Sequence, residues 1–152
     1  MPYFARFEAR GHSRPTEIVE RVITAVLNVF PEELRSRVKV ETQTAEGYNR
    51  TTIAVISAVL RAKLHCETAV RHLLRELSSD DRKTLASTLM QRIDEQCVFF
   101  VRIDKQAAYL GHLKLATGPD MISVKIHIQQ YPRCTQETAA SLVEGLLTEI
   151  GD

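Results

Sequence analysis

Residues 104–111, DKQAAYLG, form the stretch of this sequence whose residue types are best suited to chemistry. They bring an acid, a base and a phenol, the groups of Asp104, Lys105 and Tyr109, into one short run. General acid–base catalysis also needs a nucleophile or a second carboxylate within reach, and none is placed beside this run. Asp104 is better explained as a residue whose side chain caps a turn. We therefore predict no catalytic residues here, and we expect a turn with Lys105 and Gln106 at its rim.

Histidines and cysteines are the other residues with chemical potential, as metal ligands or reactive thiols. His112 and His127 would lie near one another across a predicted hairpin, but zinc usually takes three or four ligands. Cys66, Cys97 and Cys134 are odd in number and have no short Cys-x-x-Cys spacing. We expect surface histidines, free thiols, no metal site and no cofactor.

Basic side chains recur at the polar positions of the predicted strands, whereas most acids fall on predicted helices. The outward set contains Arg6, Arg10, Arg37, Lys39, Arg102, Lys114 and Lys125, with His112 and His127 beside them. Only Glu8 and Glu41 oppose it. Phosphate recognition uses such a surface, because each neutralised phosphate releases counterions. Phe4 and Phe100 are expected on the same face, where aromatic rings stack on exposed bases.

A plainer interpretation of this face stays open. An exposed sheet face must be polar in any case, and Lys or Arg on strands also deters edge-to-edge aggregation. The face assignments further assume that no bulge shifts the parity of a strand. Under the RNA-binding interpretation, the predicted contact residues are Arg6, Arg10, Arg37, Lys39, Arg102, Lys105, Gln106, Lys114, Lys125 and His127.

Length and composition are those of an ordinary folded domain, which we predict to span residues 1–152. The chain is 44% hydrophobic and 26% charged, with a net charge of +1. A net charge this small does not by itself indicate a nucleic-acid binder. The apolar runs are shorter than the ~20 residues that cross a bilayer, and charges interrupt the N-terminal segment. We expect a cytoplasmic protein without membrane contact.

Hydrophobic periodicity predicts the elements that position these residues. Alternation indicates strands at 3–10, 37–42, 97–103, 109–115 and 122–129. Residues 51–60, TTIAVISAVL, fit a strand better than a helix because they are rich in β-branched side chains, and 47–49 break the chain before them. Three- and four-residue spacing indicates helices that occupy 15–30, 67–77, 78–93 and 135–150.

The resulting order is β-α-β-β-α-α-β-β-β-α, with a hairpin between 109–115 and 122–129. Two consecutive helices in mid-chain exclude a strict βαβ alternation. The fold class is therefore α+β, with a single largely antiparallel sheet and the helices packed on one face. The other face of such a sheet can meet water or a partner.

A resemblance to a known family rests on three stretches, namely 102–111 (RIDKQAAYLG), 113–115 (LKL) and 122–126 (ISVKI). They resemble a family of small archaeal proteins described as predicted RNA-binding proteins and predicted exosome subunits. The strand–helix unit ending at 30–31 and the run 46–48 are similar in placement. The resemblance implies a fold similar to the large-subunit ribosomal protein that binds 5S ribosomal RNA, and a cytoplasmic role in RNA processing or degradation. It implies no catalytic residues.

These observations support a noncatalytic RNA-binding protein, with structured RNA and exosome or other RNA-processing proteins as partners. The resemblance directs attention to Lys105, Gln106, Lys114 and Lys125. The alternative is a protein–protein interaction or homodimerisation module that uses the sheet face or an edge strand. A third hypothesis, an enzyme for a small anionic ligand, requires a deep pocket with perturbed titrating groups.

Overall fold

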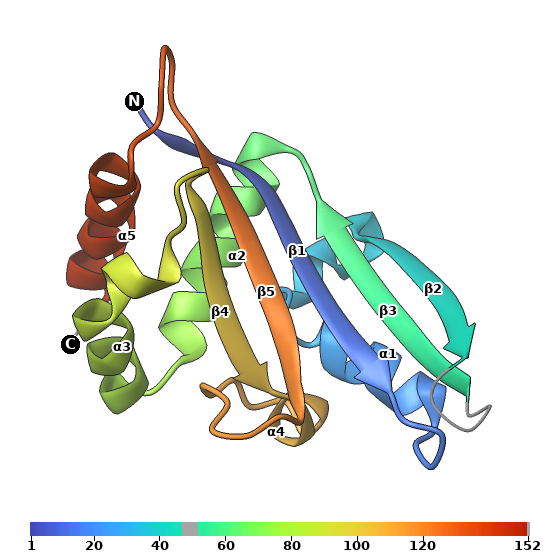
Figure 1. Ribbon diagram of the computed structural model, residues 1–152. Helices are drawn as coiled ribbons and strands as arrows, with labels where there is room; N and C mark the ends of the chain where they lie inside the picture. The colour runs from blue at the N-terminus through green and yellow to red at the C-terminus, as the bar shows by residue number, and fades with distance from the viewer. Residues whose placement is uncertain (47–51, 152) are drawn as a thin grey trace.

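One five-stranded antiparallel sheet organises the chain (Figure 1). The computed structural model describes residues 1–46 and 52–151. The strands are β1 (Tyr3–Ser13), β2 (Lys39–Glu46), β3 (Thr52–Leu60), β4 (Val98–Asp104) and β5 (Met121–Gln129). Their order across the sheet is β2-β3-β1-β5-β4, so the N-terminal strand lies in the centre. The predicted break at 47–49 and the predicted strand start at position 51 lie outside the described residues.

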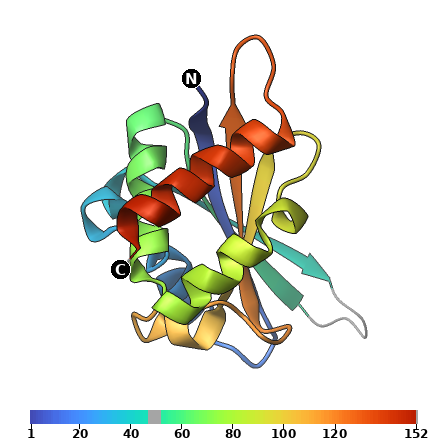
Figure 2. The same ribbon diagram turned by 90° about the vertical axis from the view of Figure 1, so that its left-hand side faces the viewer.

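Helices cover one face of this sheet, and among the placed residues no helix covers the other. They are α1 (Val19–Leu27), α2 (Lys63–Glu76), α3 (Ser79–Ser87), α4 (Lys105–Tyr109) and α5 (Gln136–Ile150), with 3-10 turns η1 (Glu32–Arg37) and η3 (Leu89–Arg92). In Figure 1, α1 and α2 lie behind the sheet. In Figure 2, α3 and α5 lie in front, and α5 contacts both α3 and α2. The predicted α+β class, with one antiparallel sheet, is confirmed.

The core lies between the sheet and the helices. Alternate strand residues point into it, among them the fully buried Phe7, Ile56, Phe99 and Ile126. The ring of Phe7 meets that of Phe30 edge-on, with centroids 5.2 Å apart. Burial of this apolar surface is the main favourable contribution to folding. In the described residues, no helix combines the length and the apolar character needed to cross a membrane.

A bulge near the start of β1 changes which side chains face outward. The pairing of β1 with β5 shifts between Phe4 and Arg6, so the alternation of faces is broken there. Phe4 is only 2% exposed and belongs to the core, so its predicted place on the open face is wrong. The strand also continues through Gly11 to Ser13, beyond the predicted end at residue 10. At Gly11, an added Cβ would lie 3.0 Å from Val26 Cγ2, so glycine lets α1 approach the strand closely.

The DKQAAYLG run forms the short helix α4 and the turn that ends it. The Asp104 carboxylate accepts a hydrogen bond of 2.8 Å from the Ala107 backbone N–H, as the capping role predicted. Gly111, at φ +88°, then turns the chain in a conformation that favours glycine. The predicted strand at 109–115 is not formed, and the predicted hairpin is wrong because β5 pairs with β4. His112 and His127 therefore do not face one another across a hairpin.

The segment that follows α4 covers the C-terminal end of the outer edge of β4. The Asp104 backbone N–H donates to the carbonyl of Lys114, and the Ala116 N–H donates to the carbonyl of Arg102. A single antiparallel bridge between Ile103 and Leu115 lies between these bonds. The alternating pattern of 109–115 therefore corresponds to one bridge rather than to a strand.

Two of the three cysteines are joined, contrary to the prediction of free thiols. Cys97 and Cys134 form a disulfide that links the turn before β4 to the loop before α5. Cys66 is free and buried, and burial raises the pKa of its thiol to about 11. The prediction failed because the two bonded cysteines are 37 residues apart and only the fold brings them together.

Candidate nucleic-acid interface

The strand register sets the outward side chains of the open face in rows. One row runs across all five strands through Lys39, Val59, Glu8, Lys125 and Phe100, in the order of the sheet. Because neighbours in such a row stand side by side, Glu8 on the central strand has a lysine on the strand next to it. The Lys125 ammonium lies 5.9 Å from the centroid of the Phe100 ring, so these two side chains share the same patch.

The next row contains two arginines. It runs through Glu41, Ser57, Arg10, Ser123 and Arg102. Arg10 and Arg102 are both exposed, and Ser123 lies between them on β5. The predicted outward positions of Arg10, Arg102 and Lys39 are therefore correct, because parity holds beyond the bulge.

Glu8 holds the arginines of the central strand in place. It is only 8% exposed, and its Oε2 lies 3.5 Å from Arg6 Nη2 and 3.4 Å from Arg10 Nη2. Arg10 Nε also donates to Ser57 Oγ at 3.2 Å. A carboxylate buried between two guanidinium groups orders both of them, so less side-chain entropy remains to be lost when an anion binds.

Two hollows on the open face share Arg6 and Arg61. The first encloses about 160 Å³ and is lined by Arg6, Glu8, Arg10, Lys39, Glu41, Gln43, Ser57, Val59 and Arg61. The second encloses about 520 Å³ and is lined by Tyr3, Ala5, Arg6, Arg61, Lys63, His127 and Gln129. We refer to these two adjacent hollows together, with the cations Arg6, Arg10, Lys39, Arg61 and Lys63, as the basic trough.

Arg61 and Lys63 were not among the predicted contact residues. They lie at the end of β3 and the start of α2, where the strand period no longer assigns a face. One signal was available, because Arg61 stands two residues after the outward Val59 and thus continues its side of the strand.

His127 lines the trough opposite Arg6 across the β1–β5 pair. Burial, and then the Arg6 guanidinium, lower the pKa of its imidazole below the usual value, although Glu8 acts in the opposite direction. The side chain is therefore neutral near pH 7 and gains charge only in more acidic solution.

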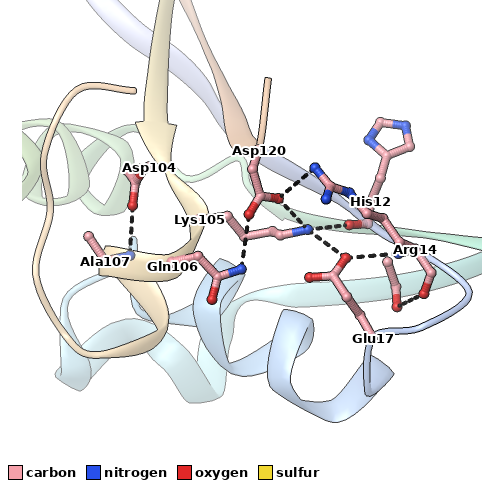
Figure 3. Close-up of polar contacts among 9 residues, drawn as sticks. His12, Arg14, Glu17, Asp104, Lys105, Gln106, Ala107 and Asp120 are labelled. Atoms are coloured by element: carbon pink, nitrogen blue, oxygen red, sulfur yellow. Dashed lines mark hydrogen bonds and ion pairs between the residues drawn. The ribbon is translucent and has the colours of Figure 1, made fainter. Parts of the chain in front are cut away.

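Lys105 does not lie on the open face, and its predicted position at an exposed rim is wrong (Figure 3). Its side chain is 4% exposed, and Nζ donates to Glu17 Oε1 at 2.8 Å and to the His12 carbonyl at 3.0 Å. Nζ also forms an ion pair of 2.8 Å with Asp120 Oδ1. The ammonium is thus fully engaged inside the protein, because α4 turns it inward.

Gln106 is exposed beside this cluster, where it donates to Asp120 Oδ2 at 2.9 Å. A hollow of about 270 Å³ lies between α1 and α4 and is lined by Thr16, Glu17, Ile18, Arg21, Val22, Ala25, Lys105, Gln106 and Tyr109. Its polar groups are largely paired with one another, so this cluster is best explained as the joint between α4, β5 and the start of α1.

The remaining predicted residues are exposed but lie away from the trough. Arg37 ends the 3-10 turn η1 and is not on a strand. Lys114 lies in the segment along the β4 edge, opposite Asp104. The predicted residues thus fall into three groups. The trough contains Arg6, Arg10, Lys39 and His127. Two more, Arg102 and Lys125, lie on the neighbouring strands, whereas the structure separates Arg37, Lys105, Gln106 and Lys114 from the trough.

Comparison with known proteins supports the same interpretation as this basic surface, namely RNA binding. A family model described as RNA binding matches residues 6–128. The chain is 33% identical, over 132 residues, to the RNA-binding protein PAB1135 of Pyrococcus abyssi, and the match covers 86% of each protein.

Solved structures show the same fold in archaeal proteins. The DUF54 protein AF2318 from Archaeglobus fulgidus superposes with a TM-score of 0.80 and 29% identity, and the match covers 94% of this chain and 99% of that one. A DUF54 protein from Methanothermobacter thermautotrophicus gives a TM-score of 0.76 with 26% identity, over 95% of this chain and 98% of that one. The predicted resemblance to archaeal RNA-binding proteins is confirmed, and the chain belongs to the family described as RNA binding.

Proposed function

We propose that this protein binds RNA through the basic trough without cleaving it. One observation carries the proposal: Arg6, Arg10, Lys39 and Arg61 line a single hollow on a sheet face that no helix covers in the described residues. The family description and the name of the Pyrococcus abyssi relative support RNA as the ligand. The trough recognises phosphates, because guanidinium groups donate paired hydrogen bonds that match phosphate oxygens.

The charge of the trough fits moderate, salt-sensitive binding. Its five cations, Arg6, Arg10, Lys39, Arg61 and Lys63, face two carboxylates, Glu8 and Glu41. Five positive and two negative charges leave a local excess of three, although the whole chain carries only +1. This concentration of charge explains how a nearly neutral protein can attract an RNA backbone.

We further propose a cytoplasmic role in RNA processing or degradation, in which the protein presents RNA to an exosome-type complex. Incubation of labelled RNA with the pure protein tests the noncatalytic part, because the RNA should remain intact. Accumulation of shorter fragments that follows the protein through purification would contradict it.

A charge-matched pair of variants tests the trough itself. Arg10→Gln/Lys39→Gln removes one arginine and one lysine from the open face, and Arg75→Gln/Lys83→Gln removes the same types from exposed positions on α2 and α3. Anisotropy titrations of a labelled RNA duplex at several salt concentrations give the affinity and its salt slope. The trough variant should bind more weakly, with a slope that is smaller by about 0.7 to 0.9 for each lost phosphate contact.

The control variant should keep both the affinity and the slope, and circular dichroism should show that both variants are folded. Equal losses in the two variants would mean that binding depends on net charge and not on the trough. An unchanged affinity in Arg10→Gln/Lys39→Gln would remove the basis of the proposal.

A second candidate function is homodimerisation through the outer edge of β2. Within the described residues, β2 pairs only with β3, whereas the outer edge of β4 is bridged by residues 114–116. Strand edges with unpaired backbone groups can pair with a second chain. Sedimentation velocity of the pure protein tests this function, and a monomer at all accessible concentrations would exclude a stable dimer.

A further inference from the structure

A loop at the end of β5 carries the most exposed internal aromatic side chain among the described residues. Tyr131 is 92% exposed, and it lies between the end of β5 and the start of α5. In Figure 1 this connection projects beyond the end of the sheet, next to the N-terminus. A ring held so far out of the core contributes nothing to folding by burial, and it leaves an aromatic face accessible to a ligand.

The loop is fixed at both of its ends. On one side, the Ile128 backbone N–H donates to the Cys97 carbonyl at 3.0 Å. On the other side, Cys134 is bonded to Cys97, and Thr135 caps α5 through its side chain. Both anchors therefore meet at Cys97, which ties the base of the loop to the turn before β4.

The loop also adjoins the basic trough. A hollow of about 450 Å³ is lined by Tyr3, Glu95, Gln96, Ile128, Gln129, Gln130, Tyr131, Pro132, Arg133 and Cys134. This loop hollow shares Tyr3 and Gln129 with the end of the trough that contains Arg61 and Lys63. The Tyr3 hydroxyl donates to Gln129 Oε1 at 2.9 Å, and Lys63 Nζ lies 4.8 Å from the Tyr3 ring centroid.

We infer that the loop formed by residues 130–134 is a stacking platform for an unpaired RNA base, whose neighbouring phosphates occupy the adjoining end of the basic trough. The inference rests on the proposed function and specifies its substrate class as RNA with a single-stranded segment. The Tyr131 ring supplies an open aromatic face, and Arg133 supplies a cation beside it. One carboxylate, Glu95, lines the same hollow and limits its positive charge.

Physical chemistry favours a base over a phosphate at this position. Bases stack on exposed aromatic rings irrespective of their identity, whereas paired bases are enclosed within a duplex. A ring at the end of a trough of cations matches the pattern of single-strand binders, in which a basic groove follows the backbone and aromatic rings hold successive bases.

The experiment compares two RNA probes and three variants. The probes are a short single-stranded oligoadenylate that contains a fluorescent adenine analogue, and a blunt-ended RNA duplex. Tyr131→Ala should weaken binding of the single strand about tenfold and abolish the quenching of the analogue, with the duplex affinity unchanged. Tyr131→Phe should restore both properties. Tyr109→Ala serves as the aromatic control, since Tyr109 is exposed on α4, away from the loop.

The outcomes separate this inference from the proposed function. Suppose that Arg10→Gln/Lys39→Gln weakens duplex binding while Tyr131→Ala leaves the single-strand affinity unchanged. RNA binding by the trough is then supported, and the inference of a stacking platform is wrong. If Tyr131→Ala weakens both probes equally, or shifts the sedimentation of the pure protein from dimer to monomer, the loop does not read an unpaired base. If the unmodified protein binds neither probe, both ideas fail.

Discussion

Lys105 Nζ lies 2.8 Å from Asp120 Oδ1, an ion pair that joins the start of α4 to the residue before β5. Because the Lys105 side chain is buried and makes two further hydrogen bonds, Lys105→Met should unpair several polar groups at once. We expect the free energy of unfolding to fall by about 2 to 3 kcal/mol. Urea denaturation measures this change.

The control for this change is Lys83→Met on the exposed side of α3, which should alter stability by less than about 0.5 kcal/mol. RNA affinity should be unchanged in folded Lys105→Met protein, because its ammonium does not reach the trough. Loss of RNA binding without loss of stability would contradict the structural role.

Acid should destabilise the protein through the partners of this lysine. Burial alone would raise the pKa of Glu17 and of Asp120, but hydrogen bonds and charge from Lys105 outweigh it and lower both. A lowered folded-state pKa contributes stability that is present above the unfolded value and is lost as the pH falls through the folded value. Stability should therefore decline below about pH 4.5, with a shallower decline in Lys105→Met. Denaturant titrations across this range measure the decline. If the free energy of unfolding falls equally with pH in the unmodified protein and in Lys105→Met, the coupling of these two carboxylates to Lys105 is refuted.

RNA affinity should rise as the pH falls below that of neutral solution. The pKa of His127 is lowered by burial and by Arg6, so the imidazole becomes a cation only in acid, where it adds a positive charge to the trough. Because the unfolded chain binds this proton more readily, the same protonation reduces stability. Titrations between about pH 7 and pH 5 should show the rise, and His127→Gln should remove it. If the rise in RNA affinity persists in His127→Gln, another titrating group causes it.

Reduction of the disulfide should lower the free energy of unfolding, but the basic trough should remain folded. Cys97 and Cys134 enclose a loop with a sequence separation of 37, for which chain entropy predicts about 3 to 4 kcal/mol of stabilisation. Thermal unfolding with and without dithiothreitol measures the effect. The double variant Cys97→Ser/Cys134→Ser should melt at one temperature under both conditions. An identical melting temperature for the unmodified protein in the two conditions would contradict the prediction.

Periodicity predicted the sheet well because each strand is buried on one face only. Residues of β5 alternate without interruption, and the sequence therefore identified both the strand and the outward positions of Lys125 and His127. The ambiguous run at 51–60 is a strand over its described residues, as its β-branched composition indicated. Strand identity and parity depend on local pattern, which a sequence displays directly.

The structural features that the sequence did not predict depend on contacts between distant parts of the chain. The bulge between Phe4 and Arg6 is a property of strand pairing, and it moved Phe4 into the core. Residues 109–115 alternate like a strand, but β4 already pairs with β5 and offers only its outer edge to Leu115. Lys105 was predicted at the surface because the sequence does not show that the start of α1 and Asp120 lie against its side chain in the fold.

In the part of the chain that the structure describes, the sheet has one closed edge and one open edge, and this asymmetry limits how many copies can add to it. A sheet with two open edges can add copies without end, which is the route to fibres. Here residues 114–116 at one end and the Ile93–Phe99 bridge at the other occupy the outer side of β4, so pairing through β2 can join two copies and then stop. Antiparallel pairing about a two-fold axis would leave both troughs on the same side. Any such pair would present RNA with two troughs on one face, and its assembly would stop at two copies.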